Sequence, residues 1–245
     1  MIFSKIWNDL RFRFYFSLCF VSGTALFLVM LYAVAPFLMG FLKGQLPPQD
    51  YAELQVFLGS YRLFMDEGWF REVQFIAFFG ILMSLGGILP ESRTPAILLT
   101  LSLPVRRRAW ILSHAGIVMI LVAILVASAS FIILLGGWIG SESYPVFKAI
   151  GGMILLTLGC FAWVGPTFAV ASVTLDRWKT ALIVLSAWFV INTLDRLPSI
   201  HPWLPGSLLD SLNDGLTPWK AFVTIAIFGA GGLLVAVHRF EKQDV

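Results

Sequence analysis

The chain has 245 residues, of which 58% are hydrophobic and only 13% are charged, and its mean hydropathy is +0.86. Because a soluble domain carries about 25% charged residues, this composition excludes an ordinary soluble protein and indicates a single membrane domain. The net charge of +3 bears on membrane orientation rather than on nucleic-acid binding. Both cysteines lie in apolar runs, so no disulfide framework or metal cluster is expected.

Residues 2–15 predict an amphipathic helix at the membrane surface. Polar and basic side chains occupy one side of a helical projection, and apolar side chains lie within an arc of about 100° on the other. A basic, aromatic helix just before a span is typical of an interfacial helix, here on the inner leaflet. The apolar arc holds Phe3, Ile6, Trp7, Leu10 and Phe14. The alternative is a frayed tail that supplies positive charge for orientation.

The pattern predicts an all-α polytopic membrane protein with six transmembrane helices, since a helix needs about 20 apolar residues to cross about 30 Å of hydrocarbon. The spans are expected at about 16–40, 73–90, 110–136, 148–175, 178–195 and 219–237. The fifth is the weakest, because its apolar run ends early, before Asp195 and Arg196. It is kept because a short span can thin the bilayer or tilt less. Without it, the charged segments on its two sides would share one face.

The first span is expected to remain in the protein. Residues 33–35 mimic the small-residue cleavage site of a signal peptide. The apolar run is longer than a typical signal core, however, and Pro36 follows the small residues directly.

Two segments between spans predict further short helices. In the loop at about 43–72, Pro47-Pro48 breaks the chain, and Asp50 with Glu53 is a plausible capping pair. Apolar residues then recur at helical spacing, so we expect a helix that lies on the membrane or packs against a span. Residues 195–218 are too apolar for a free loop and are interrupted by prolines, which favours short re-entrant or interfacial helices.

The segment at 91–109 separates the second and third spans. Pro90 ends the second span, and residues 91–103 can form about three helical turns. Pro104 stops this helix, and three arginines follow at 106–108, where they can anchor the next span at an anionic leaflet. One side of the helix is apolar, with Ile97, Leu98, Leu101 and Leu103. Such a surface must be covered by the membrane, by another span or by a docked protein, and composition does not choose among them.

Lysine and arginine counts set the expected orientation. With the N-terminus inside, the inner segments hold eleven of the 17 Lys and Arg residues but only five of the 14 Asp and Glu residues. We therefore expect both termini and residues 91–109 on the cytoplasmic side of the inner (cytoplasmic) membrane.

The residues from Glu91 to Arg108 resemble the cytoplasmic loop of ABC type-2 transporter permeases. There the loop commonly reads as an acid, a small residue, a leucine run and a Leu-Pro-Val-Ser-Arg-like ending, and this chain has Glu91, Leu98-Leu99 and residues 101–105 reading LSLPV before its arginines. The interfacial helix, the six spans, the broken segment before the last span and the charged tail at 239–244 are consistent with the family. The chain departs from the pattern at Thr94-Pro95, where a glycine is common, and at Arg106, where a serine is common.

This resemblance implies that residues 91–109 are a coupling helix, which sits in a groove of a separate ATP-binding subunit. The coupling residues would be Glu91, Arg93, Ile97, Leu98, Leu101, Leu103, Pro104 and Arg106. Two copies of the ATPase subunit would bind ATP and Mg²⁺, so no cofactor is expected in this chain, which has no G-x-x-x-x-G-K-[ST] loop. A second permease is the expected membrane partner, either a second copy that forms a homodimer or a different, paired permease, and the chain itself is not expected to be an enzyme.

Other functions for this chain stay open. Secondary transport is disfavoured because no Asp, Glu, Lys or Arg lies in the middle of a predicted span. A membrane-embedded enzyme would have to use a pair such as Ser113 and His114, but neighbours on a helix do not face each other. A non-transporting scaffold or sensor partner would share the topology. For a transporter, the apolar interior favours a lipidic, amphipathic or hydrophobic cargo.

Overall fold

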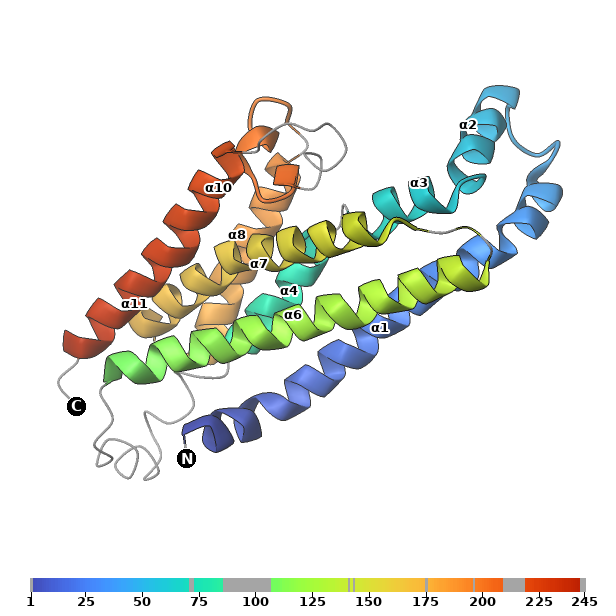
Figure 1. Ribbon diagram of the computed structural model, residues 1–245. Coiled ribbons are helices and arrows are strands. Elements are labelled where there is room, and N and C mark those ends of the chain that lie inside the picture. The colour runs from blue at the N-terminus through green and yellow to red at the C-terminus, as the bar shows by residue number, and fades with distance from the viewer. Residues whose placement is uncertain are drawn as a thin grey trace.

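The computed structural model describes residues 2–70, 73–85, 107–140, 142, 144–174, 176–195, 197–208 and 219–242. Within these ranges the chain is all-helical, with no strand, and its long helices pack side by side in an elongated bundle (Figure 1). The elements are α1 (Ile2–Leu42), α2 (Pro48–Leu58), α3 (Tyr61–Met65), the π-helix η1 (Asp66–Phe70), α4 (Val73–Ser84), α6 (Arg107–Ile139), α7 (Val146–Thr174), α8 (Arg177–Leu194), the 3₁₀-helix η2 (His201–Trp203), α10 (Trp219–Ile225), the π-helix η3 (Ala226–Ala230) and α11 (Gly231–Lys242).

Four helices are long and apolar enough to cross a membrane: Ile6–Leu42, Arg108–Ile139, Val146–Thr174 and Trp219–Lys242. They correspond to the first, third, fourth and sixth predicted spans. The shortest has 24 residues, or about 36 Å at 1.5 Å per residue, which exceeds the hydrocarbon thickness. In place of the other two spans, the described residues hold the shorter helices α4 and α8, of 12 and 18 residues.

The start of the chain differs from the separate interfacial helix that the sequence predicts. Residues 2–42 form one helix with Pro36 inside it. No glycine or proline precedes Gly23, so nothing in the sequence breaks the helix between residues 2–15 and the predicted span. Ile6, Leu10 and Phe14 are 1%, 0% and 6% exposed and belong to the main core. The apolar arc therefore packs on neighbouring helices instead of lying on lipid.

Trp7 is partly buried against the same core, while Phe3 is one of the residues whose side chains the structure does not describe.

The predicted helix in the loop after the first span is confirmed, although not its cap. α2 starts with Pro47 at the N-cap and Pro48 at the first helical position, where a missing N–H costs nothing. Asp50 lies in the first turn of α2, near the positive end of the helix dipole, and no side chain caps the helix. α2 buries no side chain, whereas α3 buries Tyr61, Phe64 and Met65.

α7 lies at the centre of the bundle and contacts α4, α6, α8, η3 and α11, while α1 packs mainly along α6. Both termini lie at the same end of the bundle (Figure 1). We call this the terminal end, comprising residues 2–14, 107–114, 172–174, 176–180 and 238–242. The far end comprises residues 40–70, 139–140, 142, 144–148, 195, 197–208 and 219–220.

Glycines allow α7 to approach the last helices closely. A Cβ added to Gly165 of α7 would overlap the carbonyl of Gly229, and one added to Gly232 would lie 2.6 Å from the nitrogen of Pro166. Small residues permit this kind of backbone approach in membrane bundles. Gly229 and Gly232 therefore serve packing within one chain.

We predict that Gly165→Ala destabilises the protein by about 1–3 kcal/mol, because the new methyl must displace the Gly229 backbone. Gly231→Ala is the matched control, since nothing lies within 4 Å of the added Cβ, and it should be neutral or stabilising. Thermal unfolding of both variants in the same detergent measures the difference. Equal stability of the two variants would contradict the close packing.

Candidate functional site

The predicted coupling residues, from Glu91 to Arg106, lie outside the described residues, but the helix ends that flank them are placed. α4 ends at Ser84 and α6 begins at Arg107. The guanidinium of Arg13 on α1 donates a hydrogen bond to the carbonyl of Leu82 at 3.1 Å, which holds the end of α4 near the start of the chain. The first turn of α6 lies at the same end as both termini (Figure 1). The segment therefore leaves and re-enters the bundle at the terminal end.

Basic side chains gather on the described helices at the terminal end. Arg13 and Arg177 lie within electrostatic range of each other. In the described part of the chain, the buried Nε of Arg177 has no hydrogen-bond partner, and neither has either ring nitrogen of His114, which is 1% exposed. The ring of His114 packs edge-on against Phe168 at 5.5 Å between centroids. This end of the bundle thus holds basic side chains together with buried nitrogen atoms that have no hydrogen-bond partner among the described residues.

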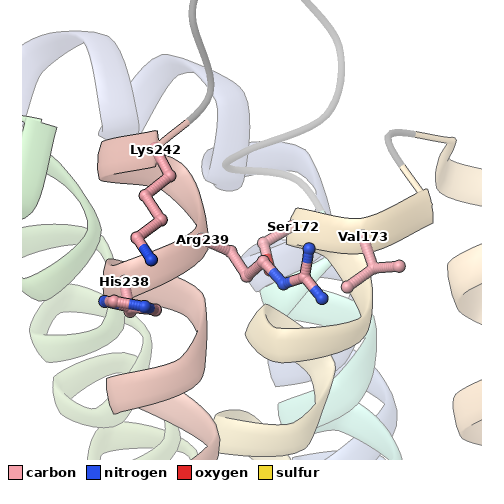
Figure 2. A pocket seen from close by; sticks show the side chains of 5 residues that line it. All are labelled: Ser172, Val173, His238, Arg239 and Lys242. Atoms are coloured by element: carbon pink, nitrogen blue, oxygen red, sulfur yellow. The ribbon is translucent and has the colours of Figure 1, made fainter.

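A pocket of about 490 Å³ opens between the last turns of α7 and α11 (Figure 2). Arg239 reaches from α11 toward Ser172 and Val173 on α7, while His238 and Lys242 lie one turn apart on α11. The Ser172 hydroxyl is fully buried and donates to the carbonyl of Ala169 at 2.7 Å. The basic groups of the pocket come from three positions of one short helix.

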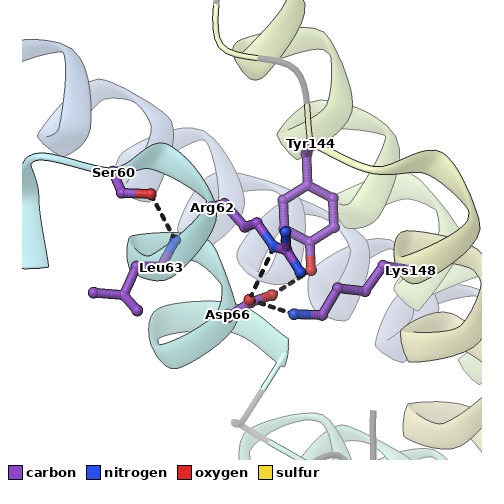
Figure 3. A network of polar contacts seen from close by, with 6 residues as sticks. All are labelled: Ser60, Arg62, Leu63, Asp66, Tyr144 and Lys148. Atoms are coloured by element: carbon purple, nitrogen blue, oxygen red, sulfur yellow. Dashed lines mark hydrogen bonds and ion pairs between the residues drawn. The ribbon is translucent and has the colours of Figure 1, made fainter. Parts of the chain in front are cut away.

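The far end carries a different kind of polar cluster, centred on Asp66 (Figure 3). Its carboxylate accepts hydrogen bonds from the Tyr144 hydroxyl and from Lys148 Nζ, the latter at 2.5 Å, and lies 3.9 Å from Arg62 Nε. The side chains of Asp66 and Lys148 are only 12% and 13% exposed. This half-enclosed cluster fastens η1 to the start of α7.

Glu142 makes a second link at the far end. One carboxylate oxygen accepts a hydrogen bond from the Tyr32 hydroxyl and the other from the backbone N–H of Tyr61, both at 2.9 Å. The Tyr61 hydroxyl donates in turn to the carbonyl of Ile133 at 2.5 Å. The loop between α6 and α7 is thereby tied to α1 and α3.

Burial raises the pKa of Tyr61 and of Tyr144, which lie outside the long apolar helices. The pKa of Tyr61 is raised to about 12, mainly by burial and further by its neighbour Tyr32. The pKa of Tyr144 is also raised, first by burial and then by its hydrogen bond to Asp66. Both hydroxyls therefore stay protonated as donors through neutral pH.

The structure does not bring Ser113 and His114 together as a hydrolytic pair. Ser113 is exposed while its neighbour His114 is buried, so the two point apart as expected from their spacing. No group of three or more His, Cys, Asp or Glu side chains in the described ranges could hold a metal ion. Cys19 and Cys160 are free.

The far-end clusters escaped the sequence analysis, which treated acidic residues there only as a count. The i, i+4 spacing of Arg62 and Asp66 was the one local signal. Tyr144 and Lys148 are 78 and 82 residues from their partner Asp66, and Glu142 is 81 residues from its partner Tyr61. No local sequence pattern pairs residues that far apart.

Comparisons with protein-family models, with curated proteins and with solved structures give no match to this chain.

We predict that Asp66→Asn destabilises the protein by about 1–3 kcal/mol, because the partly buried Lys148 ammonium loses its carboxylate. Glu53→Gln on the exposed surface of α2 is the control and should change stability by less than about 0.5 kcal/mol. Chemical unfolding of both variants in detergent measures the difference. If Asp66→Asn behaved like the control, the cluster would not fasten η1 to α7.

The raised pKa of Tyr61 predicts that the protein loses stability in alkaline solution. Its folded pKa of about 12 exceeds the unfolded value of about 10, so its contribution is complete below pH 10 and falls as the pH rises toward 12. The stability difference between the wild type and Tyr61→Phe should therefore shrink between pH 10 and pH 12. A difference that stayed constant over this range would contradict the buried donor.

Proposed function

We propose that this chain is the membrane-spanning permease subunit of an ATP-binding cassette exporter of the type-2 class, driven by a separate ATPase. One observation carries the proposal: the two helix ends that flank residues 86–106 lie at the same end of the bundle as both termini. A motif that resembles a coupling helix therefore leaves the bundle on the side where an enzyme in the cytoplasm could reach it. Under this proposal, residues 91–109 and both termini would lie in the cytoplasm.

The direction of the helices supports six spans in the cytoplasmic membrane. α1 runs from the terminal end to the far end, α4 runs back toward Arg13, and α6 and α7 repeat this pair. α8 starts beside Arg13 at Arg177 and ends at Leu194, and the last helix returns to Lys242. α8 has 18 residues, or about 27 Å, which suits a short span with little tilt.

The proposed mechanism assigns each kind of residue in the coupling segment a role. The apolar side chains of Ile97, Leu98, Leu101 and Leu103 would be buried in a groove of the ATPase, and Glu91 and Arg93 would pair with its charges. Pro104 would end the helix, and Arg106 would anchor it at the anionic inner leaflet. Two ATPase copies would bind ATP and Mg²⁺ and close on each other.

Movement of the coupling segment would reach the rest of the bundle through α4 and α6. α6 packs along α1 and α7, and Arg13 ties α1 to the end of α4. A push at the terminal end would thus be shared by four helices before it reached the far end. A second permease copy, as a homodimer, would complete the pathway, for which the apolar interior favours a lipidic or hydrophobic cargo.

We predict that the intact protein, purified from its native membrane in mild detergent, retains an ATP-hydrolysing partner. The partner should be lost from Glu91→Arg and from the double variant Leu98→Glu/Leu101→Glu, because a charged or inverted surface cannot be buried in the groove. Both variants should still insert, since the changes lie outside the spans.

Val56→Glu is the matched control, because Val56 is 70% exposed on α2 at the far end, and it should keep the partner. Recovery of the ATPase with the Glu91 and Leu98 variants would remove the coupling assignment. Recovery of the wild-type chain alone, or with partners that hydrolyse no ATP, would favour a membrane scaffold or sensor partner.

A further inference from the structure

The pocket between α7 and α11 has three basic residues and no carboxylate among the described residues that line it. His238, Arg239 and Lys242 line it, and within the described residues none of the three has an ion pair or a hydrogen bond from its side chain. Arg239 extends from α11 toward Val173 on the α7 side, while His238 and Lys242 lie near each other along α11, so the cations border the space at two positions (Figure 2). An anion placed there would meet charge from more than one direction.

The position of the pocket is set by the glycine contact. α7 and α11 run in the same direction toward the terminal end (Figure 1). Ser172 and Arg239 each lie about two turns beyond the glycines Gly165 and Gly232, where the two backbones approach most closely. The helix ends are therefore held side by side, and the pocket does not depend on a loop.

An exposed apolar strip leads along α11 into the pocket. Leu234 and Val235 are 67% and 49% exposed, and they precede His238 and Arg239 by four residues each, on the same face of the helix. The strip belongs to the helix Trp219–Lys242, which is long and apolar enough to span a membrane. An apolar surface that ends in cations matches an acyl chain that ends in a phosphate.

We propose that this pocket binds the phosphate of an anionic lipid, with an acyl chain along Leu234 and Val235. Arginine can hold two phosphate oxygens at once, and lysine supplies a compact charge beside them. A pocket of about 490 Å³ admits a headgroup, and basic pockets between membrane helices are suited to such headgroups. A free phosphate ion would use the cations but would gain nothing from the apolar strip. The proposal is independent of the transport function.

The test compares lipid retention by the purified protein. Native mass spectrometry would count phosphatidylglycerol and phosphatidylcholine bound to the wild type and to the triple variant His238→Gln/Arg239→Gln/Lys242→Gln. The matched control is Arg11→Gln/Arg108→Gln/Lys179→Gln, which removes three exposed basic groups from the same end. Helix content and thermal unfolding would show that both variants fold. A milder variant, Arg239→Lys, keeps the charge but loses the two-point contact.

We expect the wild type to prefer phosphatidylglycerol, and the triple variant to bind it about 30-fold more weakly, since two full charges are lost. The control should bind as the wild type does, Arg239→Lys should be intermediate, and millimolar inorganic phosphate or glycerol phosphate should not displace the lipid. Equal losses in the two triple variants would overturn the proposal. So would equal binding of the two lipids, or displacement by inorganic phosphate, which would indicate a site for a free anion.

Discussion

The interior of a bilayer offers no partner to a charged group, and this constraint arranges the whole chain. The four long apolar helices carry their charged residues near their ends, so the protein has two polar ends separated by an apolar middle. The two ends differ in chemistry. At the far end, the carboxylates of Asp66 and Glu142 are paired with donors from distant parts of the chain, whereas at the terminal end the buried Nε of Arg177 and both ring nitrogens of His114 have no hydrogen-bond partner among the described residues.

The two ends also differ in how many polar contacts join their helices. The far end is fastened: Asp66 ties η1 to α7, and Glu142 ties the α6–α7 loop to α1 and α3. Donors and acceptors that already bond one another have few free positions for hydrogen bonds to a binding partner. The terminal end is held by packing, by the hydrogen bond from Arg13 to the carbonyl of Leu82 and by the hydrogen bond between the Thr174 and Thr180 hydroxyls. The side chains of His238, Arg239 and Lys242 at this end are exposed. Partners and anionic lipids are therefore expected at the terminal end.

Part of this architecture is readable from the sequence, because hydropathy and length are local properties. They predict the four long helices and the helix after Pro47-Pro48. The projection of residues 2–15 puts Ile6, Leu10 and Phe14 on one face, and all three are buried. A projection cannot tell whether lipid or a neighbouring helix covers that face. The Asp66 cluster and the contact of Gly165 with Gly229 join residues far apart in the chain, and such contacts leave no periodic signal. The coupling residues from Glu91 to Arg106 lie outside the described ranges and stay a prediction.

The central claim is that the terminal end, with the segment around Glu91, faces the cytoplasm. Single cysteines placed at Ser92, Lys242 and Glu53 in a chain without Cys19 and Cys160 would be exposed to a membrane-impermeant maleimide on intact cells. The account predicts that the cysteine at Glu53 reacts at once, and that those at Ser92 and Lys242 react only after the membrane is permeabilised. Labelling of the cysteine at Ser92 on intact cells would contradict the account, because no cytoplasmic ATPase could then reach the segment.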